Sequence, residues 1–138
     1  MKEYMKLALE EAKIAYKHGD VPVGAVIVKN NKIISKAHNK KEKNNNATNH
    51  AEIIAINKAC KKIKSWHLEE CELYSTMEPC MMCTGAILQS RIKKISYSIK
   101  NESFGYLSKM NSKGIIVQEG LYKDESLELL KSFFKTKR

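Results

Sequence analysis

The sequence has few of the residues that divide a chain or anchor it in a membrane. Only two of its 138 residues are proline and six are glycine, and no stretch rich in either forms a linker. No apolar run approaches the roughly 18 residues of a membrane-spanning helix. Acidic residues interrupt the apolar ones near the N-terminus, which argues against a secretory signal. We therefore expect residues 1–138 to form a single domain, without a membrane span, in the cytoplasm.

Arginine is also scarce. Of the 25 lysine and arginine residues, only Arg91 and Arg138 are arginine, and the formal net charge is +10. A basic surface attracts nucleic acid and other polyanions. The abundance of lysine, asparagine and isoleucine is equally what a codon bias toward A and T would give. The charge therefore supports a nucleic-acid partner without establishing one.

Four cysteines in a chain that we expect in the cytoplasm do not indicate a disulfide framework, because disulfides are rare in that compartment. Cys80 and Cys83 form a CxxC pair, which indicates metal or redox chemistry. Cys60 and Cys71 lack such spacing, and we expect them to be small buried apolar residues.

Hydrophobic periodicity predicts an alternation of helices and strands. The expected helices span 2–18, 51–63, 80–90 and 121–135, and the expected strands span 21–29, 32–36, 73–76, 92–99 and 114–117. Gly19 ends the first helix, and Asn30-Asn31 turns the first two strands into a hairpin. In the last helix, Leu127, Leu130 and Phe134 are expected to face inward. These elements predict a mixed sheet with helices on both faces.

Two short motifs fall at expected helix starts, where sites on such sheets tend to lie. The first is His50-Ala51-Glu52, and the second is Pro79-Cys80-Met81-Met82-Cys83. Cysteines three residues apart at a helix start can place both sulfurs on one metal, and the positive helix end favours thiolates. Two thiolates and one imidazole leave the fourth position of a zinc tetrahedron open for water.

Glu52 lies two residues after His50, where it can exchange protons with a water molecule without binding the metal. Each motif has a simpler interpretation when taken alone. A lone CxxC fits half of a structural zinc site or a redox pair, and Glu52 alone is a stabilising residue in the first turn of a helix. The combination favours a catalytic zinc site with His50, Cys80 and Cys83 as ligands and Glu52 as the general acid and base.

An H-x-E motif followed by P-C-x-x-C is the known signature of zinc deaminases acting on cytosine and adenine. The chain resembles the cytidine/deoxycytidylate deaminase superfamily, and within it the bacterial tRNA-specific adenosine deaminases, from about Met5 to Phe134. The stretches Val21-Pro22-Val23-Gly24 and Met82-Cys83-Thr84-Gly85-Ala86 are more particular to that branch.

The resemblance implies a three-layer α/β/α sandwich with a mixed five-stranded sheet, a zinc cofactor and a homodimer. It implies conversion of the wobble adenosine of a tRNA anticodon to inosine, with release of ammonia. Asn39, Ala51 and Pro79 match positions that bind the substrate, Asn39 through the purine edge. The helix after Cys80 would lie near the dimer interface.

One region departs from the family pattern. The segment 100–114 is several residues shorter than is usual in the family. Its stretch Asn101-Glu102-Ser103-Phe104-Gly105 lacks the family's usual acidic residue. Deamination of a free base or nucleoside of the guanine, cytosine or cytidine type therefore remains an alternative. A non-catalytic RNA-binding subunit is a second alternative, which Glu52 disfavours. The lysine-rich stretches 40–43 and 135–138 could contact phosphates or form a solvated surface.

Overall fold

The protein was analysed as a computed structural model, which describes residues 1–110 and 114–137. Helices and strands alternate as the periodicity predicts. In chain order they are α1 (Lys2–Lys17), β1 (Gly24–Lys29), β2 (Lys32–His38), α2 (Ala51–Ile63), β3 (Cys71–Met77), α3 (Met81–Ser90), β4 (Lys94–Ile99), the 3-10 turn η1 (Leu107–Lys109), β5 (Ile116–Glu119) and α4 (Lys123–Thr136). No helix in the described ranges is long and apolar enough to cross a membrane.

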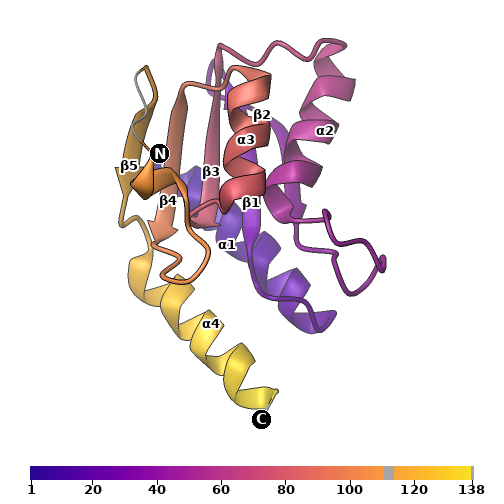
Figure 1. The fold of residues 1–138 in the computed structure, drawn as a ribbon, viewed down its shortest axis with the longest axis vertical. Coiled ribbons are helices and arrows are strands. Elements are labelled where there is room, and N and C mark those ends of the chain that lie inside the picture. The colour runs from indigo at the N-terminus through magenta and orange to yellow at the C-terminus, as the bar shows by residue number, and fades with distance from the viewer. Residues whose placement is uncertain (111–113, 138) are drawn as a thin grey trace.

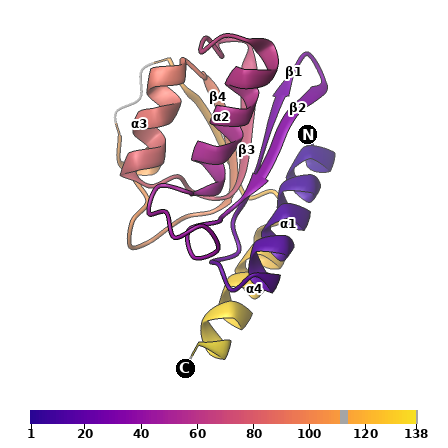
Figure 2. The same cartoon turned by 90° about the vertical axis from the view of Figure 1, so that its right-hand side faces the viewer.

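The strands form one mixed sheet in the order β2-β1-β3-β4-β5. β1 pairs antiparallel with β2 and β3, whereas β4 pairs parallel with β3 and β5. Helices α2 and α3 cover one face of the sheet, and α1 and α4 lie on the other (Figures 1 and 2). The predicted three-layer sandwich with a mixed five-stranded sheet is confirmed.

Both faces of the central strands are buried because both are covered by helices. The larger core cluster lies under α2 and α3 and includes Ile27, Leu73, Ile87 and Ile95. A smaller cluster lies under α1, where Val26 and Tyr74 of the sheet meet Met5 and Ala8 of the helix. Cys71 is buried in the larger core as predicted, and Cys60 packs half-buried against it.

Helix α1 approaches the sheet closely at Gly24, the first residue of β1. A Cβ atom added there would lie 1.9 Å from the carbonyl oxygen of Ala8, so no side chain fits without moving the helix. The Gly24 N–H also donates to Thr76 Oγ1 of β3 at 3.1 Å. The glycine of the Val21-Pro22-Val23-Gly24 stretch thus sets the distance between helix and sheet.

Strand boundaries differ from the predicted ones by two or three residues. β1 begins at Gly24 and not at Val21, because the Val23 N–H donates to the Val21 carbonyl at 2.8 Å in a tight turn. β5 begins at Ile116 rather than Gly114. Residues 111–113, within the divergent segment 100–114, and Arg138 of the basic tail lie outside the described residues.

The inward face of α4 differs from the predicted one. Leu130 and Phe133 are 6% and 5% exposed, whereas Leu127 and Phe134 are 37% and 52% exposed. The prediction for Leu130 is therefore confirmed, and those for Leu127 and Phe134 are wrong. The reason is that only one side of α4 contacts the protein, against β4 and α1, so the buried stripe is narrower than the apolar pattern.

Candidate active site

Two helix starts meet on the α2/α3 side of the sheet. His50 is the residue before the first turn of α2, and Cys80 holds the same position in α3. The two helices pack against each other (Figure 1). The motifs that lie 30 residues apart in the sequence therefore converge on one place.

Three side-chain donor atoms are close enough to share one metal ion. His50 Nδ1 lies 3.7 Å from Cys80 Sγ and 3.5 Å from Cys83 Sγ, and all three donors lie within 4.8 Å of one another. Zinc bonds of about 2.3 Å to sulfur and 2.0–2.1 Å to nitrogen place tetrahedral N and S ligands roughly 3.6 Å apart. The donor set therefore fits zinc in size and chemistry, and it leaves one coordination position open.

The two thiols affect each other's ionisation. A hydrogen bond from Cys83 lowers the pKa of Cys80 to about 3. Sharing that proton, together with burial, raises the pKa of Cys83. The hydrogen bond to Cys80 raises the pKa of His50. The positive end of α3 favours the thiolate form of Cys80 as well, and a bound metal would replace the shared protons.

Glu52 lies in the first turn of α2, 4% exposed. Burial raises the pKa of its carboxyl to about 7. Such a carboxyl takes up and releases protons near neutral pH, which is what a general acid and base requires.

A cavity of about 1490 Å³ opens beside these groups. His50, Glu52 and Cys80 line it together with residues of α4. Residues of two loops, 39–50 and 100–106, also line it, and we call these the rim loops. The basic side chains that line the cavity are Lys41, Lys100, Lys131, Lys135 and Lys137. Acidic side chains line it as well: Asp20, Glu42, Glu52, Glu78 and Glu102. The cavity is thus large, and charges of both signs line it.

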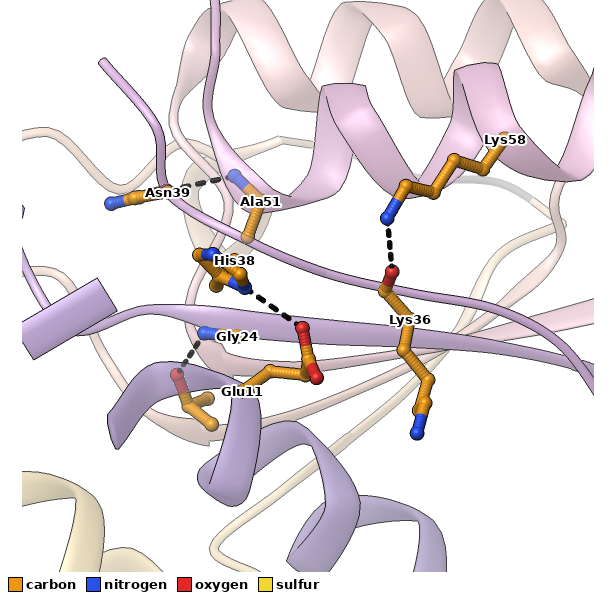
Figure 3. Close-up of polar contacts among 8 residues, drawn as sticks. Glu11, Gly24, Lys36, His38, Asn39, Ala51 and Lys58 are labelled. Carbon is orange, nitrogen blue, oxygen red and sulfur yellow. Dashed lines mark hydrogen bonds and ion pairs between the residues drawn. The ribbon is translucent and has the colours of Figure 1, made fainter. Parts of the chain in front are cut away.

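Asn39 lines this cavity and also holds the start of α2. Its Oδ1 accepts the Ala51 N–H at 2.7 Å (Figure 3), and its Nδ2 donates to the Val21 carbonyl at 3.0 Å. An amide side chain has two N–H donors and two acceptor lone pairs, so one of each remains for a ligand. The Ala51 N–H, by contrast, already donates its hydrogen bond to Asn39.

The predicted site residues therefore fall into two groups. Asn39, His50, Glu52 and Cys80 line the cavity. Cys83 and Ala51 are fully buried behind this surface, and Pro79 is buried as well. The Pro79 carbonyl accepts the Tyr106 N–H at 3.1 Å, so this residue joins the α3 start to the loop 100–106.

Sequence analysis does not identify the buried carboxylates that shape the two rim loops. Asp20, 1% exposed, accepts the Glu42 N–H at 2.7 Å and the Lys43 N–H at 3.3 Å. Glu78, 2% exposed, accepts the Asn101 N–H at 3.2 Å and the Ser108 N–H at 2.7 Å. The one available signal is position, since each acid stands just outside a strand.

A partly buried pair involves His38, the residue before Asn39. His38 Nδ1 is 2.8 Å from Glu11 Oε1 of α1 (Figure 3), and the pair ties the end of β2 to that helix. Its residues are too far apart in the sequence for a pattern to pair them.

Comparisons with known proteins agree with this geometry. Residues 1–138 match the family of MafB19-like deaminases. The tRNA-specific adenosine deaminase of Aquifex aeolicus is 44% identical over 99% of this chain and 96% of its own length.

Solved structures give two further likenesses. One, from a study of A-to-I editing by tRNA:A34 deaminases at the wobble position, superposes with a TM-score of 0.89 at 33% identity over 94% of this chain and all of that one. A guanine deaminase from Bacillus subtilis has a TM-score of 0.69 at 36% identity over 80% of this chain and 76% of its own.

Proposed function

Because the chain belongs to the MafB19-like deaminase family and is 44% identical to a tRNA-specific adenosine deaminase, we propose that it converts the wobble adenosine of a tRNA anticodon to inosine. The observation that carries the proposal is the convergence of His50, Cys80 and Cys83 beside the buried Glu52, at a cavity that five lysines help to line. The reaction consumes one water molecule and releases ammonia. Such an enzyme would work in the cytoplasm, where its RNA substrate is.

Zinc is the cofactor that the donor set fits best, because thiolate and imidazole ligands suit it. His50, Cys80 and Cys83 would hold it. When bound, zinc would lower the pKa of a water molecule from 15.7 toward 7. The two negative charges of the thiolates would balance the charge of Zn²⁺, and the imidazole is neutral. The loaded site would therefore be near neutral overall.

Glu52 would move the protons. As a carboxylate it removes a proton from the attacking water and delivers it to N1 of the purine, while the oxygen adds to C6. The second water proton then passes through the same carboxyl to the amine, the C6–N bond breaks, and ammonia leaves. The pKa of about 7 suits both steps, because the carboxyl both accepts and returns protons near neutrality.

Asn39 would orient the base. Its remaining N–H donor can bind an acceptor on the purine edge, while its other contacts to Ala51 and Val21 keep the amide plane fixed. The buried Ala51 and Pro79 would then act by holding Asn39 and the α3 start in place. Lysines at the mouth of the cavity would contact phosphates of the anticodon loop.

We also propose a homodimer formed through α3. Met81, Met82 and Leu88 on this helix are 66%, 37% and 40% exposed, an apolar surface on a helix whose other side packs in the core. Exposed apolar patches of this kind are typical of interfaces between proteins.

The proposal is tested by ammonia release from the zinc-loaded protein. The substrates are an anticodon stem-loop with a wobble adenosine, free adenosine, guanine and cytosine. We expect activity on the stem-loop alone, with inosine at the wobble position. Glu52→Gln should lower kcat about 10²- to 10⁴-fold. Glu69→Gln, an exposed acid paired with His67, is the matched control. An unchanged rate in Glu52→Gln would contradict the mechanism.

The second candidate is a guanine deaminase. It is favoured by the likeness to the Bacillus subtilis enzyme, which is 36% identical. Turnover of guanine without RNA, and none of the stem-loop, would keep the role of Glu52 and change the substrate.

A further inference from the structure

Phe104 is the most exposed large apolar side chain beside the active site. It lies in the loop 100–106 and is 75% exposed. It lines the main cavity together with His50 and Cys80. It also lines an adjoining hollow of about 450 Å³, with Met81 and Tyr106. The ring thus stands on the rim that separates the two spaces.

The loop that carries Phe104 is fixed by a buried carboxylate. Glu78 accepts the Asn101 and Ser108 N–H groups, and Asn101 Oδ1 accepts the Phe104 N–H at 3.0 Å. Gly105 pairs with Cys80 in an antiparallel bridge. The ring is therefore held next to the residue before α3, even though its own surface is free.

Gly105 makes this close packing possible. A Cβ atom at this position would lie 2.5 Å from both Glu78 Oε1 and the Asn101 carbonyl oxygen. The loop can therefore approach Glu78 only with glycine here, and this approach sets the height of Phe104 above the cavity.

Charged side chains of both signs lie around Phe104, and the acidic ones include Glu42 and Glu102. Lys100 and Lys41 line the same cavity, and Lys109 lines the adjoining hollow. The chain as a whole carries a net charge of +10. An exposed aromatic ring among lysines matches a nucleic-acid strand, in which stacked bases alternate with phosphates.

We propose that Phe104 stacks on a nucleobase directly adjacent to the adenosine that enters the cavity. The inference rests on the proposed function, because it needs an RNA strand at this mouth. Flipping the target base out of a loop leaves its neighbours unstacked on one side. The Phe104 ring replaces that lost stacking, and it contributes to binding of the strand rather than to the chemical step.

The test measures the dissociation constant of a fluorescein-labelled anticodon stem-loop by anisotropy, using zinc-loaded Glu52→Gln protein so that the RNA is not turned over. Adding Phe104→Ala should weaken binding about 5- to 150-fold, the range for the loss of one base–aromatic stack. Phe104→Trp should bind within about twofold of the parent, because it keeps a π face. Trp66→Ala is the matched control, since Trp66 is 54% exposed and lies beyond the C-terminal end of α2.

Two further RNAs locate the stacked base. Each lacks one base, either on the 5′ or on the 3′ side of the target adenosine. The Glu52→Gln parent should bind one of these two RNAs more weakly than the intact loop. On that RNA, adding Phe104→Ala should weaken binding no further. An equal cost of Phe104→Ala on all three RNAs would overturn the proposal, and so would unchanged binding to the intact loop.

A partner subunit is the other possible occupant of this surface. Sedimentation of Phe104→Ala distinguishes it, because a shift from dimer to monomer would assign the ring to the interface and overturn the proposal. Failure of the proposed function is seen separately: wild-type protein would then release no ammonia from the stem-loop, whatever the Phe104 variants bind.

Discussion

Two loops line the cavity, and each is held by a buried acidic side chain. Asp20 accepts two backbone N–H groups of the loop 39–50, and Glu78 accepts the N–H groups of Asn101, in the loop 100–106, and of Ser108. Both acids are at most 2% exposed. A buried polar group of this kind is tolerated because backbone donors bind it.

The two loops differ in which of their residues the buried acid fixes. Glu78 fixes a loop that pairs with Cys80 and carries Phe104, whereas the N–H groups held by Asp20 belong to Glu42 and Lys43 on the exposed part of its loop. Asn39 has anchors of its own at Val21 and Ala51. We infer that the Glu78 loop is coupled to the candidate metal site through Cys80. The contacts of Asp20 at Glu42 and Lys43 lie away from the two ends of their loop, Asn39 and His50, and are less coupled to it.

The largest expected effect comes from the site that both loops border. Cys83→Ala removes a fully buried thiol from the donor set. Ammonia release should fall to background and the bound zinc per chain, measured by atomic absorption, should fall well below one. Cys60→Ala, outside the donor set, is the control. Full activity in Cys83→Ala would mean that neither loop borders a metal-dependent centre.

The next effect tests the Glu78 loop. Glu78→Ala leaves two backbone N–H groups without an acceptor, which should lower the free energy of unfolding in urea by about 3 kcal/mol. Because the loop adjoins Cys80, kcat/KM on the stem-loop should fall at least about tenfold in the protein that remains folded. Gly105→Ala should act in the same direction through its clash with Glu78. Glu10→Ala, on the exposed side of α1, is the control.

Asp20→Ala should separate stability from activity. Asp20, like Glu78, accepts two hydrogen bonds from backbone N–H groups, at 2.7 and 3.3 Å. We therefore expect its loss to lower the free energy of unfolding by about 2 kcal/mol. The loss in kcat/KM should stay below that of Glu78→Ala. An equal loss of kcat/KM in both variants would show that the two loops are coupled to the site alike.

The smallest effect compares the loops as phosphate contacts. Lys41→Gln and Lys100→Gln should each reduce the salt dependence of stem-loop binding, by about 0.7 in the slope of log K against log salt if each meets one phosphate. Lys6→Gln on α1 should leave the slope unchanged. A change in only one of the two cavity variants would assign the RNA backbone to that side.

Much of the fold and of the metal site follows from the sequence. The helix starts at His50 and Cys80 follow from hydrophobic periodicity and motif spacing, because both are local properties of the chain. The two motifs meet because α2 begins after β2 and α3 begins after β3. Both strands are antiparallel to β1 and so run in the same direction, which brings their carboxyl ends to one edge of the sheet.

The loops could not be predicted in this way. Nothing local distinguishes Glu78 or Asp20 from a solvated acid, because their N–H partners lie more than 20 residues away. The orientation of α4 depends on contacts made by one side only, so the choice between Phe133 and Phe134 is decided by packing and not by pattern. Glu52 is an intermediate case, since the motif gives its role and only burial gives its pKa.

The double engagement of Asn39 constrains how this protein can diverge. The same amide that lines the cavity also accepts the first N–H of α2, so under the proposed function a replacement at this position would change base recognition and helix stability together. Aspartate would keep the acceptor for Ala51 and lose the donors. A lineage moving toward another base would therefore have to compensate at the start of α2 for any change at Asn39.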